Sequence, residues 1–114
     1  MAAKSLTDFH PILILTTAGS LSEAKKISRL ILSHRLAACV NILSGVDSHY
    51  WWRGAMRRAT EFLLLIKSSR SRLNDLAKLV KKYHSYEVPE LIAFSVVWGD
   101  RRYLHWLKES MEKP

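Results

Sequence analysis

The sequence predicts an α+β protein of the ferredoxin-like class, with the element order βαββαβ and one added C-terminal helix. Three observations predict it. Short strand-like apolar runs alternate with amphipathic segments of helical period, two long strand-like segments meet at a tight turn, and no repeat or linker divides the chain. Right-handed connections place both main helices on one face of a four-stranded antiparallel sheet. We therefore expect a single domain over 1–114, in which 1–9 is a flexible N-terminal segment.

The first half of the chain predicts a strand, a helix and the start of a second strand. The apolar run in His10–Thr17 is typical of a short buried strand, and Ser20 with Glu23 forms a capping box at the start of a helix. A second strand begins with Leu36–Ile42 and continues past Gly45, where we expect a bulge or bend. The helix between these strands has one apolar stripe, made of Leu21, Ala24, Ile27, Leu30 and Ile31.

The second and third strands predict a long hairpin. Residues 46–52 alternate in character, Arg53-Gly54 is typical of a two-residue turn in which glycine supplies a positive φ, and Met56–Lys67 returns as the third strand. Its FLLLI run lacks alternation, so we place this strand centrally, covered on both faces.

The length of this hairpin indicates that it projects beyond its own domain. The segment from Ala37 to Tyr50 spans about 45 Å when extended. A domain of this length is only about 34 Å across. The tip of the hairpin carries Tyr50, Trp51 and Trp52, which a monomer would leave in water. We therefore expect the tip to contact another subunit.

The second half of the chain predicts a helix, a strand and a final helix. Ser69–Tyr83 has apolar residues at helical spacing, and His84–Pro89 is a connection, since proline holds the residue before it extended. Leu91–Trp98 predicts the fourth strand, and Asp100 is suited to cap the last helix. That helix carries Tyr103, Leu104, Leu107 and Met111.

The composition excludes several classes of protein. A hydrophobic content of 48% with 25% charged residues is typical of a soluble globular protein and argues against disorder. No apolar run is longer than Phe62–Ile66, which is too short for a transmembrane helix of about 20 residues. The single cysteine, Cys39, permits neither an internal disulfide nor a cysteine metal cluster, and its apolar neighbours predict burial. We expect a cytoplasmic protein, and an upstream targeting segment stays an open alternative.

The net charge of +8 is concentrated in one quarter of the chain. Residues 53–82 hold nine basic and two acidic side chains, a net charge of +7. Such a segment is compatible with binding to nucleic acid, phosphate ligands or anionic membranes, but it is more often a solvated face. The third strand lacks the aromatic pattern of RNA-recognition domains, so we expect no sequence-specific binding of nucleic acid.

The sequence contains no recognised catalytic motif, and we expect no enzyme. The only catalytic-looking group is the HSYEVPE segment, His84–Glu90, whose alternative role is to order the connection, with Tyr86 packed and Glu90 paired to a cation. His84 and Glu90 also supply an imidazole and a carboxylate for a metal ion. A zinc site typically takes four positions, so further ligands would have to come from another element or subunit. His49 and His105 are candidates by residue type only.

Several segments, taken in order, resemble the CutA family of divalent-cation tolerance proteins. They span roughly residues 12–107, nearly the whole chain. The segments are Thr16-Thr17-Ala18, Arg35–Asn41 (RLAACVN), Ser48-x-Tyr50-x-Trp52-x-Gly54, Glu61 with Lys67, His84–Glu90 and Tyr103–Leu107.

The resemblance implies a ferredoxin-like protomer in a tight homotrimer, like the PII signalling proteins. It implies a non-enzymatic role in the response to or tolerance of divalent metal ions, with copper or similar ions as ligands. Animal members are linked to anchoring a cholinesterase at membranes. The alternative is therefore a trimeric scaffold that binds a protein or membrane partner through inter-subunit or basic surfaces. Clefts between subunits, for a metal ion or a small ligand, would be lined by Tyr50, Trp52, Lys67, Tyr86 and Glu90.

The chain departs from the family pattern at several positions. Many members have Pro where Ser85 stands, and many have acidic residues where Arg57 and Arg58 follow the hairpin turn. Some bacterial members have a cysteine in place of Thr16 and a second histidine in place of Tyr83, and these are among the proposed metal ligands. Of that set, Glu90 and His84 remain in this chain.

Overall fold

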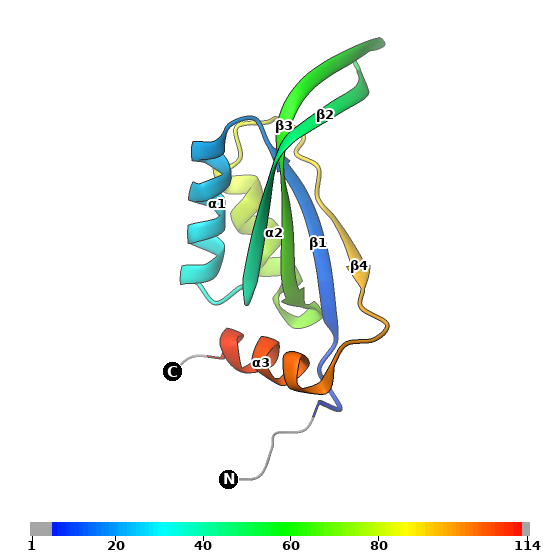
Figure 1. The fold of residues 1–114 in the computed structure, drawn as a ribbon. Helices are drawn as coiled ribbons and strands as arrows, with labels where there is room; N and C mark the ends of the chain where they lie inside the picture. Colours follow the sequence, from blue (N-terminus) through cyan, green and yellow to red (C-terminus); the bar gives the residue numbers. More distant parts are fainter. Residues whose placement is uncertain (1–5, 113–114) are drawn as a thin grey trace.

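The computed structural model describes residues 6–112 and has the element order that the sequence predicts (Figure 1). Residues 1–5 of the expected flexible segment lie outside the described residues, and residues 6–9 form a turn in which the Phe9 N–H donates to the Leu6 carbonyl. The elements are β1 (Pro11–Ala18), α1 (Leu21–Ser33), β2 (Cys39–Trp52), β3 (Ala55–Ser69), α2 (Leu73–Tyr83), β4 (Ile92–Ser95) and α3 (Arg101–Met111).

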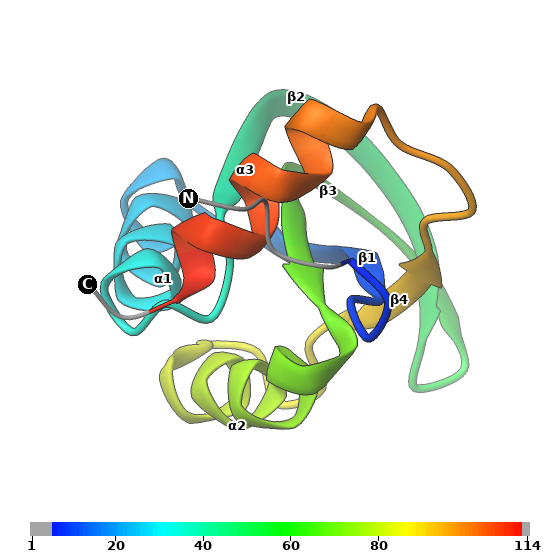
Figure 2. The ribbon, with the colours of Figure 1, turned by 90° about the horizontal axis from the view of Figure 1, so that it is seen from below.

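The four strands form one antiparallel sheet in the order β2-β3-β1-β4. Helices α1 and α2 lie side by side on one face, and α3 crosses the end of the sheet (Figure 2). The predicted ferredoxin-like architecture is therefore confirmed. No helix among residues 6–112 is long and apolar enough to cross a membrane.

The hydrophobic core lies between the two helices and the sheet. Ile14 of β1 pairs with Ile66 of β3, and both are fully buried beneath the helices. In the predicted stripe of α1, Ala24, Ile27 and Ile31 are buried, Leu30 is half-buried, and Leu21 in the first turn is exposed. The helices contribute Ala24, Ile27, Ile31, Leu76 and Val80 to this core.

Within residues 6–112, neither α1 nor α2 covers the opposite face of the sheet (Figure 2). Residues paired across neighbouring strands project from the same face, so Leu15 shares this face with Leu65 and Ile92. The expectation that β3 is covered on both faces is wrong for the single chain, because both main helices pack on one side. We call the other side the open sheet face and define it by Leu13, Leu15, Leu63, Leu65, Ile92 and Phe94.

The hairpin of β2 and β3 projects from the body of the domain, as predicted (Figure 1). The protomer measures 56 × 26 × 23 Å, and its radius of gyration of 15.4 Å exceeds the value of about 13 Å for a compact chain of this length. Arg53 and Gly54 form the two-residue turn with φ values of 50° and 77°. Such a pair of positive φ angles is typical of a type I′ turn.

The expected bulge at Gly45 is present and determines which side chains share a face. The β2–β3 register shifts between Leu43 and Val46, where Gly45 has a φ of 72°. One extra residue reverses the side-chain alternation of the strand beyond it. Tyr50 therefore projects from the same face as Glu61, which pairs with Val46.

Three element boundaries differ from the sequence prediction. Strand β4 is shorter than Leu91–Trp98, because its partner β1 begins at Pro11, whose carbonyl accepts the last cross-strand bond from the Val96 N–H. The helix predicted from Ser69 starts with a 3-10 turn over Arg70–Arg72. Strand β2 begins at Cys39 rather than Leu36, because the turn that ends α1 extends to Leu36. Cys39 is half-buried rather than buried.

Candidate functional site

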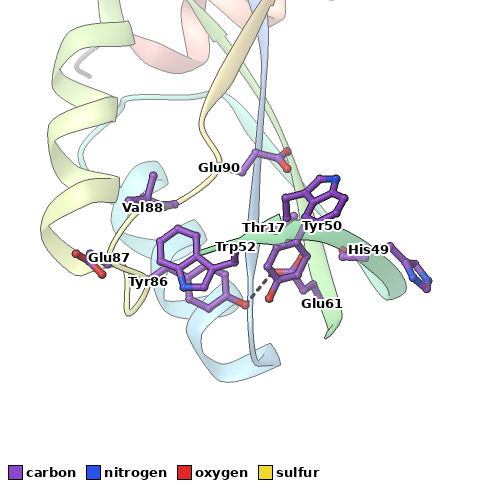
Figure 3. Close-up of a pocket in the computed structure, with 12 residues that line it drawn as sticks. Thr17, His49, Tyr50, Trp52, Glu61, Tyr86, Glu87, Val88 and Glu90 are labelled. Carbon is purple, nitrogen blue, oxygen red and sulfur yellow. Dashed lines mark hydrogen bonds between the residues drawn. The ribbon is translucent and has the colours of Figure 1, made fainter. Parts of the chain in front are cut away.

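A cavity of about 650 Å³ lies where the hairpin leaves the sheet (Figure 3). Residues 48–52 of β2 form one wall, and residues 86–90 of the loop after α2 form another. Thr17 of β1 and Glu61 of β3 complete the lining. Four segments that are distant in the sequence therefore meet at one site.

The loop is tied to the sheet by Tyr86. Its hydroxyl donates a 2.8 Å hydrogen bond to Oε2 of Glu61, a carboxylate that is only 7% exposed (Figure 3). Burial, followed by this bond and the charge of Glu61, raises the pKa of Tyr86 well above its ordinary value. Tyr86 therefore remains a neutral donor. A Cβ at Gly19 would stand 3.0 Å from the Tyr86 hydroxyl oxygen, so the chain before α1 passes close to this site.

His84 holds the start of the same loop. Its Nε2 lies 2.6 Å from the Thr17 carbonyl oxygen, and its Nδ1 lies 3.0 Å from the Tyr86 amide nitrogen. A carbonyl oxygen only accepts and an N–H only donates, so these contacts place the hydrogen on Nε2 and the lone pair on Nδ1. The side chain is fully buried, and Nδ1 is also 3.7 Å from Oε1 of Glu23. Both ring nitrogens of His84 are therefore engaged.

The structure brings together most of the residues predicted for the cleft. Tyr50, Trp52, Tyr86 and Glu90 all line the cavity. Lys67 does not line it. It lies farther down β3, opposite Leu13, with its Nζ 5.9 Å from the centre of the Tyr103 ring.

The predicted metal pair is not brought together as a ligand set in one chain. Glu90 is exposed and forms no ion pair with the described residues, whereas His84 has no free ring nitrogen. Nowhere in residues 6–112 do three His, Cys, Asp or Glu side chains converge as metal ligands. The two residues therefore do not fit a metal ion within one chain, and metal binding through this pair stays a prediction that needs further ligands.

His49 points away from the aromatic side of the cavity (Figure 3). Its Nε2 lies 3.2 Å from Oδ1 of Asp47, which also accepts a 2.7 Å hydrogen bond from Nε of Arg58. These contacts, with Arg58 as the larger cause, lower the pKa of the Asp47 carboxyl. The basic segment is divided between this exposed hairpin and helix α2, which carries Lys78, Lys81 and Lys82.

Two carboxylates of the cavity were missed as site residues by the sequence prediction. Glu61 entered only as part of the resemblance, and Glu87 only as part of a motif. The sequence does show that Glu61 stands two residues before Leu63, so that its side chain shares a face of β3 with Leu63 and Leu65. Without the register across the Gly45 bulge, that spacing does not place it beside Tyr50.

Comparisons with known proteins identify the family to which the chain is similar. The sequence model of the CutA1 divalent ion tolerance protein matches residues 12–110. The chloroplastic protein CutA 1 of Oryza sativa is 42% identical over 91% of this chain. The divalent-cation tolerance protein CutA of Thermus thermophilus is 40% identical over 85% of this chain and 94% of its own. The chain spans 59% of the rice protein and 54% of a similar Arabidopsis thaliana protein.

Solved structures show the same fold. The crystal structure of CutA1 from Oryza sativa superposes with a TM-score of 0.87 at 40% identity, and covers 92% of this chain and 96% of its own. The Thermus thermophilus structure gives a TM-score of 0.86 at 39% identity, and covers 88% and 97%. With the family model matching nearly the whole described chain, the protein belongs to the CutA1 divalent ion tolerance family.

Proposed function

We propose that this chain acts as a homotrimer in the tolerance of divalent metal ions, without catalysing a reaction, and that its cavity opens into the cleft between subunits. The role in divalent-ion tolerance is proposed from the family, because the names of its members state it. We also propose a cytoplasmic location for this chain, in contrast to relatives whose names mention the chloroplast or the periplasm.

The open sheet face is the main support for assembly into a trimer. Ile92 and Phe94 are 48% and 51% exposed on it, and Trp98 beyond β4 is 79% exposed. A contiguous apolar face of this kind marks an interaction surface. A second and a third copy would cover it, and the projecting hairpin would reach a neighbour's sheet.

The divalent ion needs ligands from more than one subunit. Copper(II) and zinc(II) prefer imidazole, thiolate and carboxylate ligands, usually four in a structural zinc site. In this chain, Glu90 offers an exposed carboxylate at the cavity rim, and Glu87 lies in the same loop. Assembly around these carboxylates is the simplest way to complete a ligand set.

Calorimetric titration with copper(II) and zinc(II) tests the ion-binding part of the proposal. Glu90→Gln keeps the shape of the side chain and removes its charge, so we expect metal affinity to fall at least about tenfold. Glu109→Gln changes an exposed carboxylate on α3, away from the cavity, and should leave the titration unchanged. Absence of binding by either metal, or equal affinities for both variants, would contradict the proposal.

A further inference from the structure

We propose that the cavity binds a small organic cation, a methylated ammonium or a guanidinium group, between the aromatic side chains of β2 and the carboxylate of Glu61. This inference rests on the proposed function, because it takes the same cavity as the ligand site. It adds a second class of ligand, which is an organic cation and not a metal ion.

The first observation is a buried carboxylate without a cation. Glu61 is 7% exposed, and its one hydrogen bond to a side chain is with the neutral hydroxyl of Tyr86. None of the ion pairs among residues 6–112 includes Glu61. Buried charges in proteins are usually paired. A tyrosine hydroxyl is either neutral or anionic, so Tyr86 does not supply a positive counter-charge.

The second observation is the sign of the charge around the cavity. Glu61, Glu87 and Glu90 all line it, and no described lysine or arginine does, although Arg53 pairs with Glu87 from outside the lining. This occurs in a chain whose formal net charge is +8. A cleft lined by one sign of charge concentrates ions of the other sign. The cavity is therefore a local acidic site on a basic protein.

The third observation is that the hairpin already holds one organic cation in this way. The guanidinium carbon of Arg53 lies 5.4 Å from the centre of the Trp52 ring, within the range of a cation–π contact. Its Nη2 lies 3.1 Å from Oε2 of Glu87. The Trp52 ring and the Glu87 carboxylate thus bind a guanidinium group together. Glu61, with the aromatic side chains of β2, provides a carboxylate and an aromatic face for a second cation in the cavity.

The size and spacing of the cavity favour an organic cation over a bare metal ion. Its volume of about 650 Å³ is within the range of small-molecule sites, about 300–1,000 Å³. The three carboxylates are spread around the cavity instead of converging (Figure 3). A metal ion needs ligand atoms within about 2.0–2.6 Å, whereas an organic cation can contact a carboxylate and an aromatic face at once.

Saturation-transfer NMR with tetramethylammonium chloride tests the inference, since its methyl protons give one sharp signal. We expect millimolar binding by the intact protein, with sodium chloride adjusted to hold ionic strength constant. The neutral tert-butanol, of similar size, should not bind. Methylguanidinium serves as a second probe, and tighter binding than tetramethylammonium would identify hydrogen bonding to the carboxylate as the stronger contact.

Two variants locate the site. Trp52→Leu keeps an apolar side chain but removes the π face, and should weaken tetramethylammonium binding about 5- to 30-fold. Glu61→Gln keeps an acceptor for Tyr86 and removes the charge, and should weaken it at least about tenfold. Trp106→Leu and Glu109→Gln are matched controls on α3, and should bind as the unmodified protein does. If Glu61→Gln fails to fold, the Trp52 variant alone decides the result.

Light scattering on the same samples separates this inference from the proposed function. A trimer that gives no saturation transfer, or that binds tert-butanol equally well, overturns the inference alone. If the Glu61→Gln variant instead loses its trimeric mass, the charge of Glu61 pairs with a basic side chain of a second copy. The carboxylate is then not free for a small organic cation, and the inference is overturned. A monomer that binds tetramethylammonium with the expected variant effects overturns the trimer and supports the inference.

Discussion

The Tyr86 hydroxyl and the Glu61 carboxylate are joined by a 2.8 Å hydrogen bond that connects the loop after α2 to strand β3. The loop also carries Glu90, and the strand forms one side of the projecting hairpin. This bond therefore ties the loop, which forms one wall of the cavity, to the hairpin whose other strand, β2, forms the second wall.

Removing the Tyr86 hydroxyl should loosen that connection. Tyr86→Phe leaves the buried Glu61 carboxylate without its donor, and we expect a loss of about 1–3 kcal/mol in the free energy of unfolding. Urea denaturation at neutral pH measures it. Tyr103→Phe, an exposed tyrosine on α3, is the control and should lie close to the unmodified protein.

The same variant has a defined pH signature. The pKa of Tyr86 is raised in the folded protein, so its contribution to stability is complete below the ordinary value of 10.0 and declines as the pH rises above it. The difference in unfolding free energy between the unmodified protein and Tyr86→Phe should therefore be constant from pH 7 to 9 and shrink above pH 10. A difference that grows at high pH would contradict this assignment.

His84 should prove important for stability in the absence of any metal. His84→Ala leaves the Thr17 carbonyl and the Tyr86 N–H without partners, which should cost about 2–4 kcal/mol. Thermal and urea unfolding in the presence of a chelator measure the effect. His10→Ala, at an exposed position before β1, is the control. Equal stability of the two variants in chelator would show that the contacts of His84 do not hold the loop.

The hairpin turn should depend on the conformation of Gly54. Its φ of 77° is in the left-handed region, where a β-branched residue costs about 1–2 kcal/mol. Gly54→Val should therefore lower the unfolding free energy by about that amount, whereas Gly54→Asn should cost less, because asparagine tolerates this region. If the two variants are equally stable, the turn does not hold these angles in solution.

The open sheet face can be tested with a single charge. Phe94→Lys places an ammonium group on this face opposite Leu13 and should prevent assembly. Leu32→Lys makes the same chemical change at an exposed position on α1 and should leave assembly intact. Sedimentation velocity distinguishes the species. Unchanged sedimentation of both variants would indicate that the open face is not the interface.

Local patterns were sufficient to predict most of the fold. The N-cap at Ser20, the apolar spacing of both main helices and the Arg53-Gly54 turn depend on residues close in sequence, and the structure agrees with each. The end of β4 could not be predicted in this way. Its apolar sequence continues to Trp98, but strand pairing stops where β1 has no further residue to offer.

The candidate site was predicted in part for a similar reason. Tyr50, Trp52, Tyr86 and Glu90 were found through their motifs, and the structure gathers them around one cavity. The fixed role of His84 depends on the Thr17 carbonyl, 67 positions away, which no local pattern reveals. The sequence shows that an imidazole is present, whereas only the fold shows that both its nitrogens are engaged.

The molar mass in solution is a direct test of assembly into a trimer. Multi-angle light scattering of the purified protein at micromolar concentration should give a single species of about three times 13.1 kDa. A stable, folded species of 13.1 kDa under the same conditions would contradict the account, because the open sheet face and the hairpin tip would then remain in water.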